Sequence, residues 1–209
     1  MQCQLPSPGG IKITKRALEI CRFPSGALLA DVGCGTGEGV SYINKNTDFR
    51  MTGIDNDPSA ISVAVAAGND CICCDATNLP YQSTSLDGIF FQCSFSKIGE
   101  PDKAILEAHR VLKPGGKIVI SDFYAQKKEE HFFGFIGRVE FKEKIISRLN
   151  DQGFELIFLE DHTKELHQLW GQIIFDYGRD VVDSMLCETG RILSAKCGYG
   201  LFIAKKTSL

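Results

Sequence analysis

The stretch ADVGCGTGEG (Ala30–Gly39) decides the fold of this chain. A short apolar run leads into Asp31 and predicts a β-strand, and the residues Glu38–Asn46 predict a helix after the glycines. Because glycines carry no side chains, such a turn leaves backbone N–H groups at a helix N-terminus open to a ligand. The stretch therefore predicts a strand, a ligand-binding turn and a helix in succession.

The spacing of Gly33, Gly35 and Gly37 narrows the class of ligand. A dinucleotide-binding turn needs the pattern G-x-G-x-x-G, and no register of these glycines places a glycine at the sixth position. A phosphate-binding loop needs Gly-Lys before Ser or Thr, whereas Ile118 follows the only such pair, Gly116-Lys117. The turn therefore favours a nucleoside-bearing ligand whose phosphates need no cradle, and it disfavours a nicotinamide dehydrogenase.

A carboxylate stands where such a ligand needs one. The sequence MTGIDND (Met51–Asp57) predicts a second strand that ends in Asp55. A carboxylate at the carboxyl end of a strand, beside a glycine turn, can accept hydrogen bonds from both hydroxyls of a ribose. Asp55 is therefore the predicted ribose-binding residue.

Four motifs in matching order resemble one enzyme family. DVGCGTG (31–37) and GIDND (53–57) are followed by CDATNLPYQSTSLDGIFFQCSFS (74–96) and HRVLKPGGKIVISDFY (109–124). They resemble the class I S-adenosylmethionine-dependent methyltransferases, and the last two resemble the small-molecule branch (methyltransferase type 11-like) that includes the ubiquinone and menaquinone biosynthesis methyltransferases. The resemblance covers roughly residues 11–124. It implies S-adenosyl-L-methionine as the cofactor and methyl transfer to a small-molecule acceptor.

Strands and helices alternate along the first two-thirds of the chain, which predicts an α/β fold with a parallel sheet covered by helices on both faces. The expected strands are Ala27–Val32, Arg50–Ile54, Asp70–Cys74, Leu86–Gln92, Lys117–Phe123, Phe154–Glu160 and Tyr199–Lys205. The expected helices are Lys12–Cys21, Thr36–Asn46, Asp57–Ala67, Pro101–Leu112 and Phe141–Gln152. The resemblance implies a Rossmann-like, doubly wound, mostly parallel seven-stranded sheet whose last strand is antiparallel.

The length of 209 residues suits one domain. We expect a single S-adenosylmethionine-dependent methyltransferase domain over residues 1–209, with an N-terminal helical segment at 11–23. The long connection before the last strand predicts a helical elaboration at about 161–198.

The resemblance implies a cofactor site at the carboxyl ends of the strands. Its residues are Asp31, Gly33, Cys34, Gly35, Asp55, Asn56, Asp75, Ala76, Gln92 and Cys93. Backbone groups of Gly33, Cys34 and Gly35 would face the methionine moiety, and Asp31 would help to hold its ammonium group. Asp31 also has an alternative role as a helix N-cap, which aspartate favours.

The remaining cofactor residues divide between the nucleoside and the reactive centre. The resemblance places Asn56 beside the adenine, Asp75 on the adenine amino group and the backbone of Ala76 against the ring. It places the pair Gln92–Cys93 beneath the sulfonium, where the acceptor pocket begins. Asp75 has the same alternative as a helix N-cap.

A general base is needed only when the acceptor holds its proton tightly, because the methyl group of a sulfonium is already activated. His131, after the fifth expected strand, and His162, after the strand at 154–160, are the candidates. The role of either remains open. A second class of function, a non-catalytic S-adenosylmethionine-binding regulatory or partner subunit, also remains open.

Charge and hydropathy limit the partners. The net charge is −3 and the pI is near 5.8, so no basic face for nucleic acid is expected. The N-terminus lacks a basic region followed by an apolar core, and no apolar stretch reaches the length of a membrane helix. We therefore expect a cytoplasmic protein with a small-molecule substrate and neither a nucleic-acid nor a membrane partner. The oligomeric state is not predicted.

Nine cysteines are a high count, and their odd number favours reduced thiols in the core. Cys71, Cys73 and Cys74 form a tight group, but no second Cys or His pair stands at zinc spacing, so we expect no metal site. Arsenite methyltransferases use several cysteines to hold the metalloid, which leaves that acceptor as an alternative.

Overall fold

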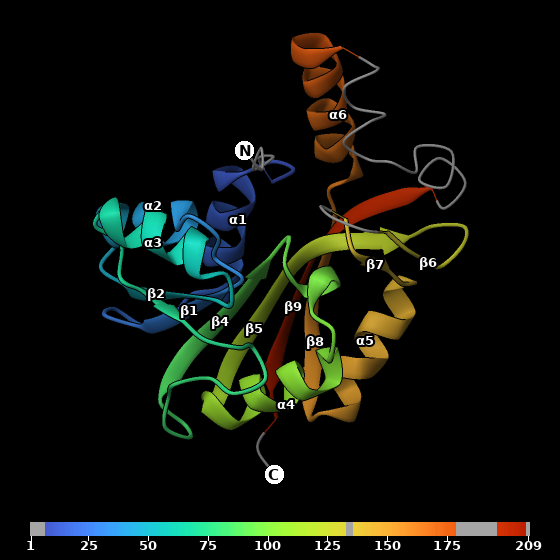
Figure 1. The fold of residues 1–209 in the computed structure, drawn as a ribbon. Helices are drawn as coiled ribbons and strands as arrows, with labels where there is room; N and C mark the ends of the chain where they lie inside the picture. Colours follow the sequence, from blue (N-terminus) through green and yellow to red (C-terminus); the bar gives the residue numbers. More distant parts are fainter. Residues whose placement is uncertain (1–6, 133–135, 179–195, 208–209) are drawn as a thin grey trace.

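A seven-stranded sheet forms the centre of the chain, with the strand order β3-β2-β1-β4-β5-β9-β8 (Figure 1). The computed structural model describes residues 7–132, 136–178 and 196–207. The strands of the sheet are β1 (Leu28–Val32), β2 (Arg50–Asp55), β3 (Cys71–Cys73), β4 (Leu86–Gln92), β5 (Leu112–Ala125), β8 (Phe154–Asp161) and β9 (Cys197–Lys206).

Strand directions confirm the predicted α/β, Rossmann-like, doubly wound sheet. β1 pairs in parallel with β2 on one side and with β4 on the other, β2 pairs in parallel with β3, and β4 with β5. The last strand, β9, is antiparallel to both β5 and β8 and lies between them. The sheet is therefore mostly parallel with an antiparallel last strand, as expected.

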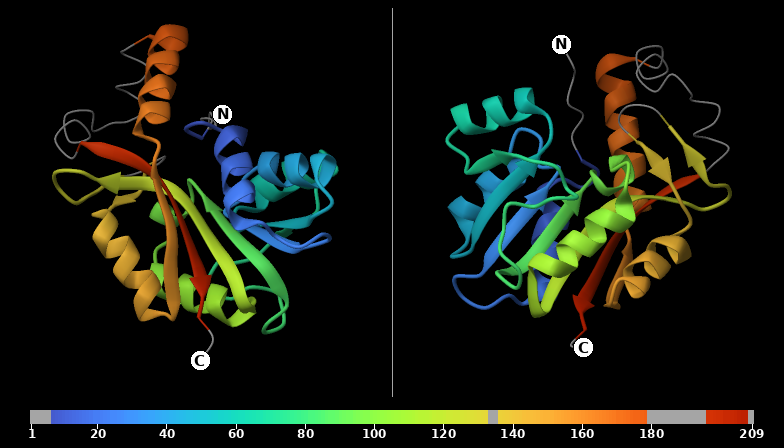
Figure 2. Two further views of the ribbon diagram at one scale, coloured as in Figure 1. Left: turned by 180° about the vertical axis from the view of Figure 1, so that it is seen from behind. Right: turned by 60° about the horizontal axis from the view of Figure 1, so that its bottom comes forward.

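Helices cover both faces of the sheet (Figure 2). The covering helices are α1 (Ile11–Cys21), α2 (Glu38–Asn46), α3 (Pro58–Ala66), α4 (Pro101–Val111) and α5 (Lys142–Asp151), and a further helix is α6 (Thr163–Tyr177). Successive strand residues alternate between two cores, because side chains along a strand point to opposite faces. Leu29 and Phe90 pack with residues of α1 and α2, whereas Ala30 and Phe91 pack with residues of α4 and α5.

The start of β5 differs from the expectation. The sequence predicts a turn at Lys113–Gly116 between a helix and a strand at Lys117, but β5 begins at Leu112, directly after α4. Leu112 pairs with Leu86, and the register then shifts so that Lys117 pairs with Gly88. The Pro-Gly-Gly stretch is thus an irregularity within the strand pairing, where glycine and proline are tolerated.

The cysteines divide between the core and the sheet edge. Cys21 and Cys93 are buried, as core thiols are expected to be, and each of the described cysteines is free. Cys73 is exposed, because β3 is an edge strand with only β2 beside it. Cys3 and Cys187 lie outside the described residues.

Each of the two segments that were expected to be helical contains a helix in its described residues. α1 occupies most of the expected segment 11–23, and α6 opens the expected elaboration, whose residues 179–195 lie outside the described part of the chain. α6 extends beyond the sheet at the end where the parallel strands finish (Figure 1). In the described ranges, no helix combines the length and the apolar character needed to cross a membrane.

Lys206, on β9, joins this strand to the end of α4 by two hydrogen bonds. Its ammonium group donates to the main-chain carbonyls of His109 (2.7 Å) and Leu112 (2.8 Å), which end α4 without intrahelical partners. We expect Lys206→Met to lower the free energy of unfolding by about 1–3 kcal/mol, because it leaves buried carbonyls unsatisfied. Urea unfolding measures this effect. The exposed neighbour provides the control Lys205→Met, and equal losses in the two variants would contradict the assignment.

Candidate active site

The strand order reverses between β1 and β4, and ligands of open α/β sheets bind at such a point, beyond the carboxyl ends of the strands. A cavity of about 360 Å³ lies there. The loops after β1, β2, β3 and β4 line it with Gly33, Asp55–Asn56, Cys74–Thr77, Ser94 and Lys97–Glu100, together with the strand residues Val32 and Ile54.

The predicted cofactor residues fall into two groups around this cavity. Those that line it are Gly33, Asp55, Asn56, Asp75 and Ala76. Those beside it are Asp31, Cys34, Gly35, Gln92 and Cys93, which lie within or directly after β1 and β4. The structure therefore brings residues from four separate strand ends to one place.

The glycine turn is shaped by backbone constraints. Gly33 and Gly35 have φ values of 79° and 53°, which glycine adopts without strain. A Cβ atom on Gly33 would lie 2.2 Å from the Cβ of Ser94, so the turn and the segment after β4 approach more closely than a side chain would permit.

The N–H groups of this turn are bonded within the chain, which differs from the expectation that they are open to a ligand. Those of Gly33 and Cys34 donate to the carbonyl of Ile54 at 2.7 and 3.1 Å, and that of Gly35 donates to Oδ2 of Asp55 at 2.8 Å. The reason is that hydrogen bonding between β1 and β2 continues past the end of β1. In the turn region, carboxylates rather than these N–H groups are therefore available to bind a ligand.

Asp55 keeps acceptor capacity after these contacts. Its Oδ1 accepts the N–H of Asp57 at 2.9 Å, and its Oδ2 accepts that of Gly35. Because a carboxylate has about four lone-pair sites, two further hydroxyl groups can be accepted. The two backbone bonds also fix the direction of the carboxylate toward the cavity that it lines.

Asp31 is buried, with 3% of its surface exposed. Its Oδ2 accepts a long hydrogen bond from Nε2 of Gln92 at 3.5 Å, and its Oδ1 has no hydrogen-bond partner among the described residues. Burial raises the pKa of Asp31 to about 7, opposed by the Gln92 hydrogen bond and reinforced by the charge of Asp55. The N-cap alternative is wrong for Asp31, because Gly37 is the N-cap residue of α2.

The amide of Gln92 is oriented by α1. The hydroxyl of Thr14, itself buried, donates to Oε1 of Gln92 at 2.7 Å, so that Nε2 of the same amide faces Asp31. A Cβ atom on Gly39 would lie 3.1 Å from both Oδ2 of Asp31 and Nε2 of Gln92. The buried oxygen of Asp31 without a partner thus has the hydrogen-bond vacancy that suits a small cation such as an ammonium group, which would also favour the ionised carboxylate.

Asp75 is exposed and holds a local turn. Its Oδ1 accepts from the N–H and the hydroxyl of Thr77 at 2.8 and 2.6 Å, and these hydrogen bonds lower the pKa of the carboxyl. The residues that follow form a turn rather than a helix, so Asp75 is not a helix N-cap. Side-chain bonds of this kind are typical of Asx turns.

Cys93 follows β4 in the left-handed region, with φ 52°, which is unusual for a residue other than glycine. It is buried, and its Sγ lies 3.0 Å from the hydroxyl of Tyr199, which donates to the carbonyl of Ser121. Burial raises the pKa of the thiol to about 12. Tyr199 was missed in the sequence analysis because it lies on β9, far from Cys93 in the chain.

Neither histidine candidate lines the cavity. His131 is exposed on the short strand β6 (Glu130–His131). His162 is the N-cap residue of α6, with ring nitrogens 3.4 Å from Glu160 and 3.5 Å from Glu165. The general-base role therefore stays a prediction for both.

The wall formed by Ser94 and Lys97–Glu100 was also missed. Ser94 donates its hydroxyl to the carbonyl of Val32 at 2.5 Å, which joins the wall to the end of β1. The sequence signal was limited to Gly99 and Pro101, which mark a loop before a helix without indicating what the loop contacts.

Comparisons with known proteins show what the chain is similar to. Residues 30–120 match the family model described as "Methyltransferase domain". Phosphoethanolamine N-methyltransferase of Triticum aestivum is 27% identical over 96% of this chain and 45% of its own length. The chain thus spans about half the length of the curated relatives it matches.

Two solved structures share the fold. The [4+2]-cyclase SpnF superimposes with a TM-score of 0.77 and 25% identity, covering 95% of this chain and 82% of that protein. Phosphoethanolamine N-methyltransferase 2 of Haemonchus contortus, in complex with phosphomonomethylethanolamine and S-adenosylhomocysteine, gives a TM-score of 0.76 and 20% identity, covering 97% of this chain and 54% of that one.

The raised pKa of Asp31 gives a pH-dependent prediction. Between about pH 4 and 7 the folded chain binds a proton at Asp31 that the unfolded chain has released, so this residue makes the free energy of unfolding fall as the pH rises. We expect Asp31→Asn to be more stable than the wild type by about 2–4 kcal/mol at pH 8, and to lose this advantage at pH 4. Urea unfolding at both pH values measures the difference; a difference that is independent of pH would contradict the assignment.

Proposed function

We propose that this chain, which has the class I S-adenosylmethionine-dependent methyltransferase fold and carries a methyltransferase domain at residues 30–120, transfers a methyl group to a small-molecule acceptor. The resemblance noted in the sequence is confirmed at the level of fold and domain. The activity and the acceptor are our proposal.

The observation that carries this proposal is the cavity at the point where the strand order reverses, with an unpartnered buried carboxylate beside it. Asp55 offers free acceptor sites, and Asp31 offers a buried carboxyl whose ionised form a bound cation would stabilise. A nucleoside that bears an amino-acid group needs both features. S-adenosylmethionine has both a ribose and an ammonium group.

In this proposal each part of the cofactor meets a different strand end. Asp31 supplies the counter-charge of the ammonium group beside the Gly33–Gly35 turn and Cys34. Asp55 accepts the ribose hydroxyls, with Asn56 flanking the adenine. Asp75 and the backbone of Ala76 contact the adenine across the cavity from the wall at 97–100.

The cofactor supplies an electrophilic methyl group on a positively charged sulfur. The contribution of the chain is to align the acceptor for in-line displacement, in which the new bond to the methyl group forms as the carbon–sulfur bond breaks. Gln92 and Cys93 lie at the end of β4 and form the start of the acceptor side. A neutral amine has a lone pair ready to attack and loses its proton to water afterwards, so it requires no positioned base.

The acceptor that we favour is a small molecule, in the cytoplasm, rather than a nucleic acid or a membrane lipid. The net charge of −3 gives no overall electrostatic attraction for nucleic acid. The relatives named phosphoethanolamine N-methyltransferases motivate phosphoethanolamine and phosphomonomethylethanolamine as the first acceptors to try.

A second candidate is an S-adenosylmethionine-binding protein that transfers no methyl group. One observation supports this second candidate. SpnF, which has the same fold, is named as a [4+2]-cyclase rather than as a methyltransferase. Binding of the cofactor and turnover must therefore be measured separately.

Titration calorimetry with S-adenosylhomocysteine tests the binding half of the proposal. We expect binding to the wild type, and about tenfold or more weaker binding to Asp55→Ala, because two ribose hydroxyls lose their acceptor. Asp48→Ala is the control, since this exposed carboxylate pairs with Ser25 near the opposite ends of the strands. Absence of binding to the wild type would overturn the proposal.

Consumption of S-adenosylmethionine tests the catalytic half. The panel contains phosphoethanolamine, phosphomonomethylethanolamine, thiols, quinol precursors, arsenite and transfer RNA. We expect turnover with a small molecule and none with the RNA. Tight cofactor binding without turnover on any acceptor would favour the non-catalytic alternative.

A further inference from the structure

One wall of the cavity is a short segment that contains no α-helix. It runs from Ser94 to Glu100 and contains a single 3-10 turn, η1 (Phe95–Lys97). Its internal main-chain bonds join Lys97 to Ser94 (3.0 Å) and Ile98 to Phe95 (3.2 Å). Because a turn of this length is held by few bonds of its own, its position depends on contacts from elsewhere.

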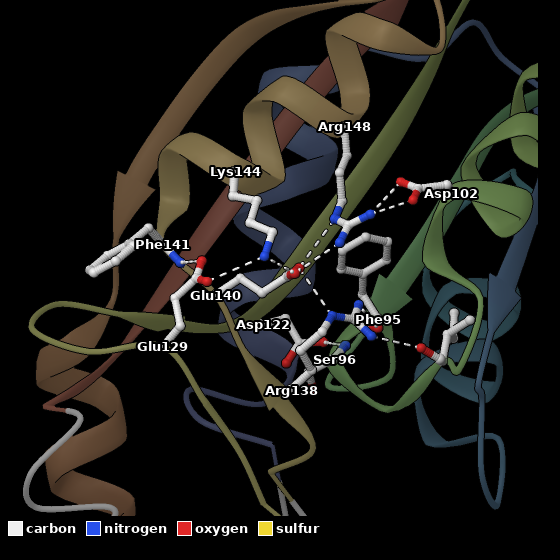
Figure 3. Close-up of polar contacts among 11 residues, drawn as sticks. Phe95, Ser96, Asp102, Asp122, Glu129, Arg138, Glu140, Phe141, Lys144 and Arg148 are labelled. Carbon is white, nitrogen blue, oxygen red and sulfur yellow. Dashed lines mark hydrogen bonds and ion pairs between the residues drawn. The ribbon is translucent and has the colours of Figure 1, made fainter.

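Arg138 provides these contacts from a distant part of the chain (Figure 3). It begins the short strand β7 (Arg138–Val139). Its Nη1 donates to the carbonyl of Ile98 at 2.8 Å and its Nη2 to that of Phe95 at 3.3 Å, while the guanidinium carbon lies 5.6 Å from the centre of the Phe95 ring. One planar group thus bridges the two carbonyls that flank the turn.

The opposite side of the turn is held by β5 and by a close backbone approach. The buried carboxylate of Asp122 accepts the N–H of Ser96 at 2.8 Å (Figure 3). Gly137, next to Arg138, has φ 75°, and a Cβ atom on it would lie 2.6 Å from the carbonyl oxygen of Ser96. The turn is therefore fixed between β5 and β7, and Arg138 is the side chain that reaches its two ends.

A buried carboxylate holds Arg138 in place. Oε2 of Glu140 lies 3.0 Å from Nε of Arg138, and Glu140 also pairs with Arg148 at 2.9 Å and Lys144 at 3.1 Å. Burial alone would raise the pKa of Glu140, but the three cations together lower it to about 2. Glu140 thus orients the Arg138 side chain before any ligand binds.

The same network holds the helix that follows the wall. Nη1 of Arg148, on α5, lies 2.5 Å from both carboxylate oxygens of Asp102, in the first turn of α4 (Figure 3). Glu140 therefore connects Arg138, which contacts the wall, with Arg148, which contacts the helix directly after it. One ion network thus contacts the segment at Phe95 and Ile98 and the helix after it at Asp102.

We propose that Arg138 is a positioning residue of the cofactor pocket, which sets the wall at residues 97–100 by holding the carbonyls of Phe95 and Ile98. This inference rests on the proposed function only in taking an adenosyl cofactor as the occupant of the cavity. Arg138 touches no ligand in this account and acts through the main chain of the wall.

The test measures the affinity for S-adenosylhomocysteine by calorimetry and the unfolding midpoint by urea in the same variants. We expect Arg138→Ala to bind about tenfold more weakly, because the wall loses two charge-assisted hydrogen bonds. Arg138→Lys keeps the charge near Glu140 but cannot bridge both carbonyls, and we expect about fivefold weaker binding with a smaller change in the midpoint. Lys128→Ala is the matched control, because this exposed lysine pairs with Glu130 on the neighbouring strand β6.

Chemical rescue separates positioning from general stability. Guanidinium ion at a low, non-denaturing concentration should restore much of the affinity of Arg138→Ala, and should leave the wild type, Lys128→Ala and Asp55→Ala unchanged. A loss caused only by general destabilisation would not respond in this way.

The outcomes distinguish this proposal from the function on which it rests. If the wild type binds no S-adenosylhomocysteine, the proposed function fails. If the wild type binds, and a folded Arg138→Ala variant binds S-adenosylhomocysteine with an affinity within about twofold of the wild type, the positioning role is overturned. If Arg138→Ala does not fold, the same twofold limit applies to Arg138→Lys. If neither variant folds, the proposal is also overturned, because Arg138 would then be required for the stability of the whole fold.

Discussion

A carboxylate buried without a counter-charge is the constraint on which this site depends. Asp31 has 3% of its surface exposed, and one of its oxygens has no hydrogen-bond partner in the part of the chain that the structure describes. Burial of such a group disfavours its charged form, which is why its pKa rises to about 7. Burial of this carboxylate therefore lowers the stability of the folded chain, and a bound cation can restore the lost stability. Such local destabilisation is characteristic of functional sites.

The parallel pairing of β1 with β2 places this carboxylate and a second one at the same edge of the sheet. Asp31 pairs with Gly53, and the next residues of β2 lead directly to Asp55. The two carboxylates differ in their surroundings. Asp55 accepts hydrogen bonds from two backbone N–H groups, whereas Asp31 accepts one long hydrogen bond from the side-chain amide of Gln92. One edge of the sheet thus offers a hydrogen-bond acceptor and an uncompensated charge within one site, which matches the two polar ends of an adenosyl amino acid.

The sequence predicted the parts of this site that depend on local pattern. The glycine turn, the strand ending in Asp55 and the alternation of strands with helices all follow from short-range residue preferences. The sequence did not reveal that the N–H groups of the turn bond to Ile54 and Asp55, because this depends on how far the β1–β2 pairing extends. Contacts between distant segments were also missed, including Tyr199 with Cys93 and Arg138 with the wall after β4. These depend on the packing of β7 and β9, whose neighbours no local pattern specifies.

A crystal structure of the chain with bound S-adenosylhomocysteine tests the central claim most directly. The account predicts the ligand ammonium within hydrogen-bond distance of Oδ1 of Asp31, both ribose hydroxyls on Asp55, and the adenine between Asp75–Ala76 and the wall at 97–100. A nucleoside bound outside this cavity, or an ammonium group held by residues other than Asp31, would contradict it.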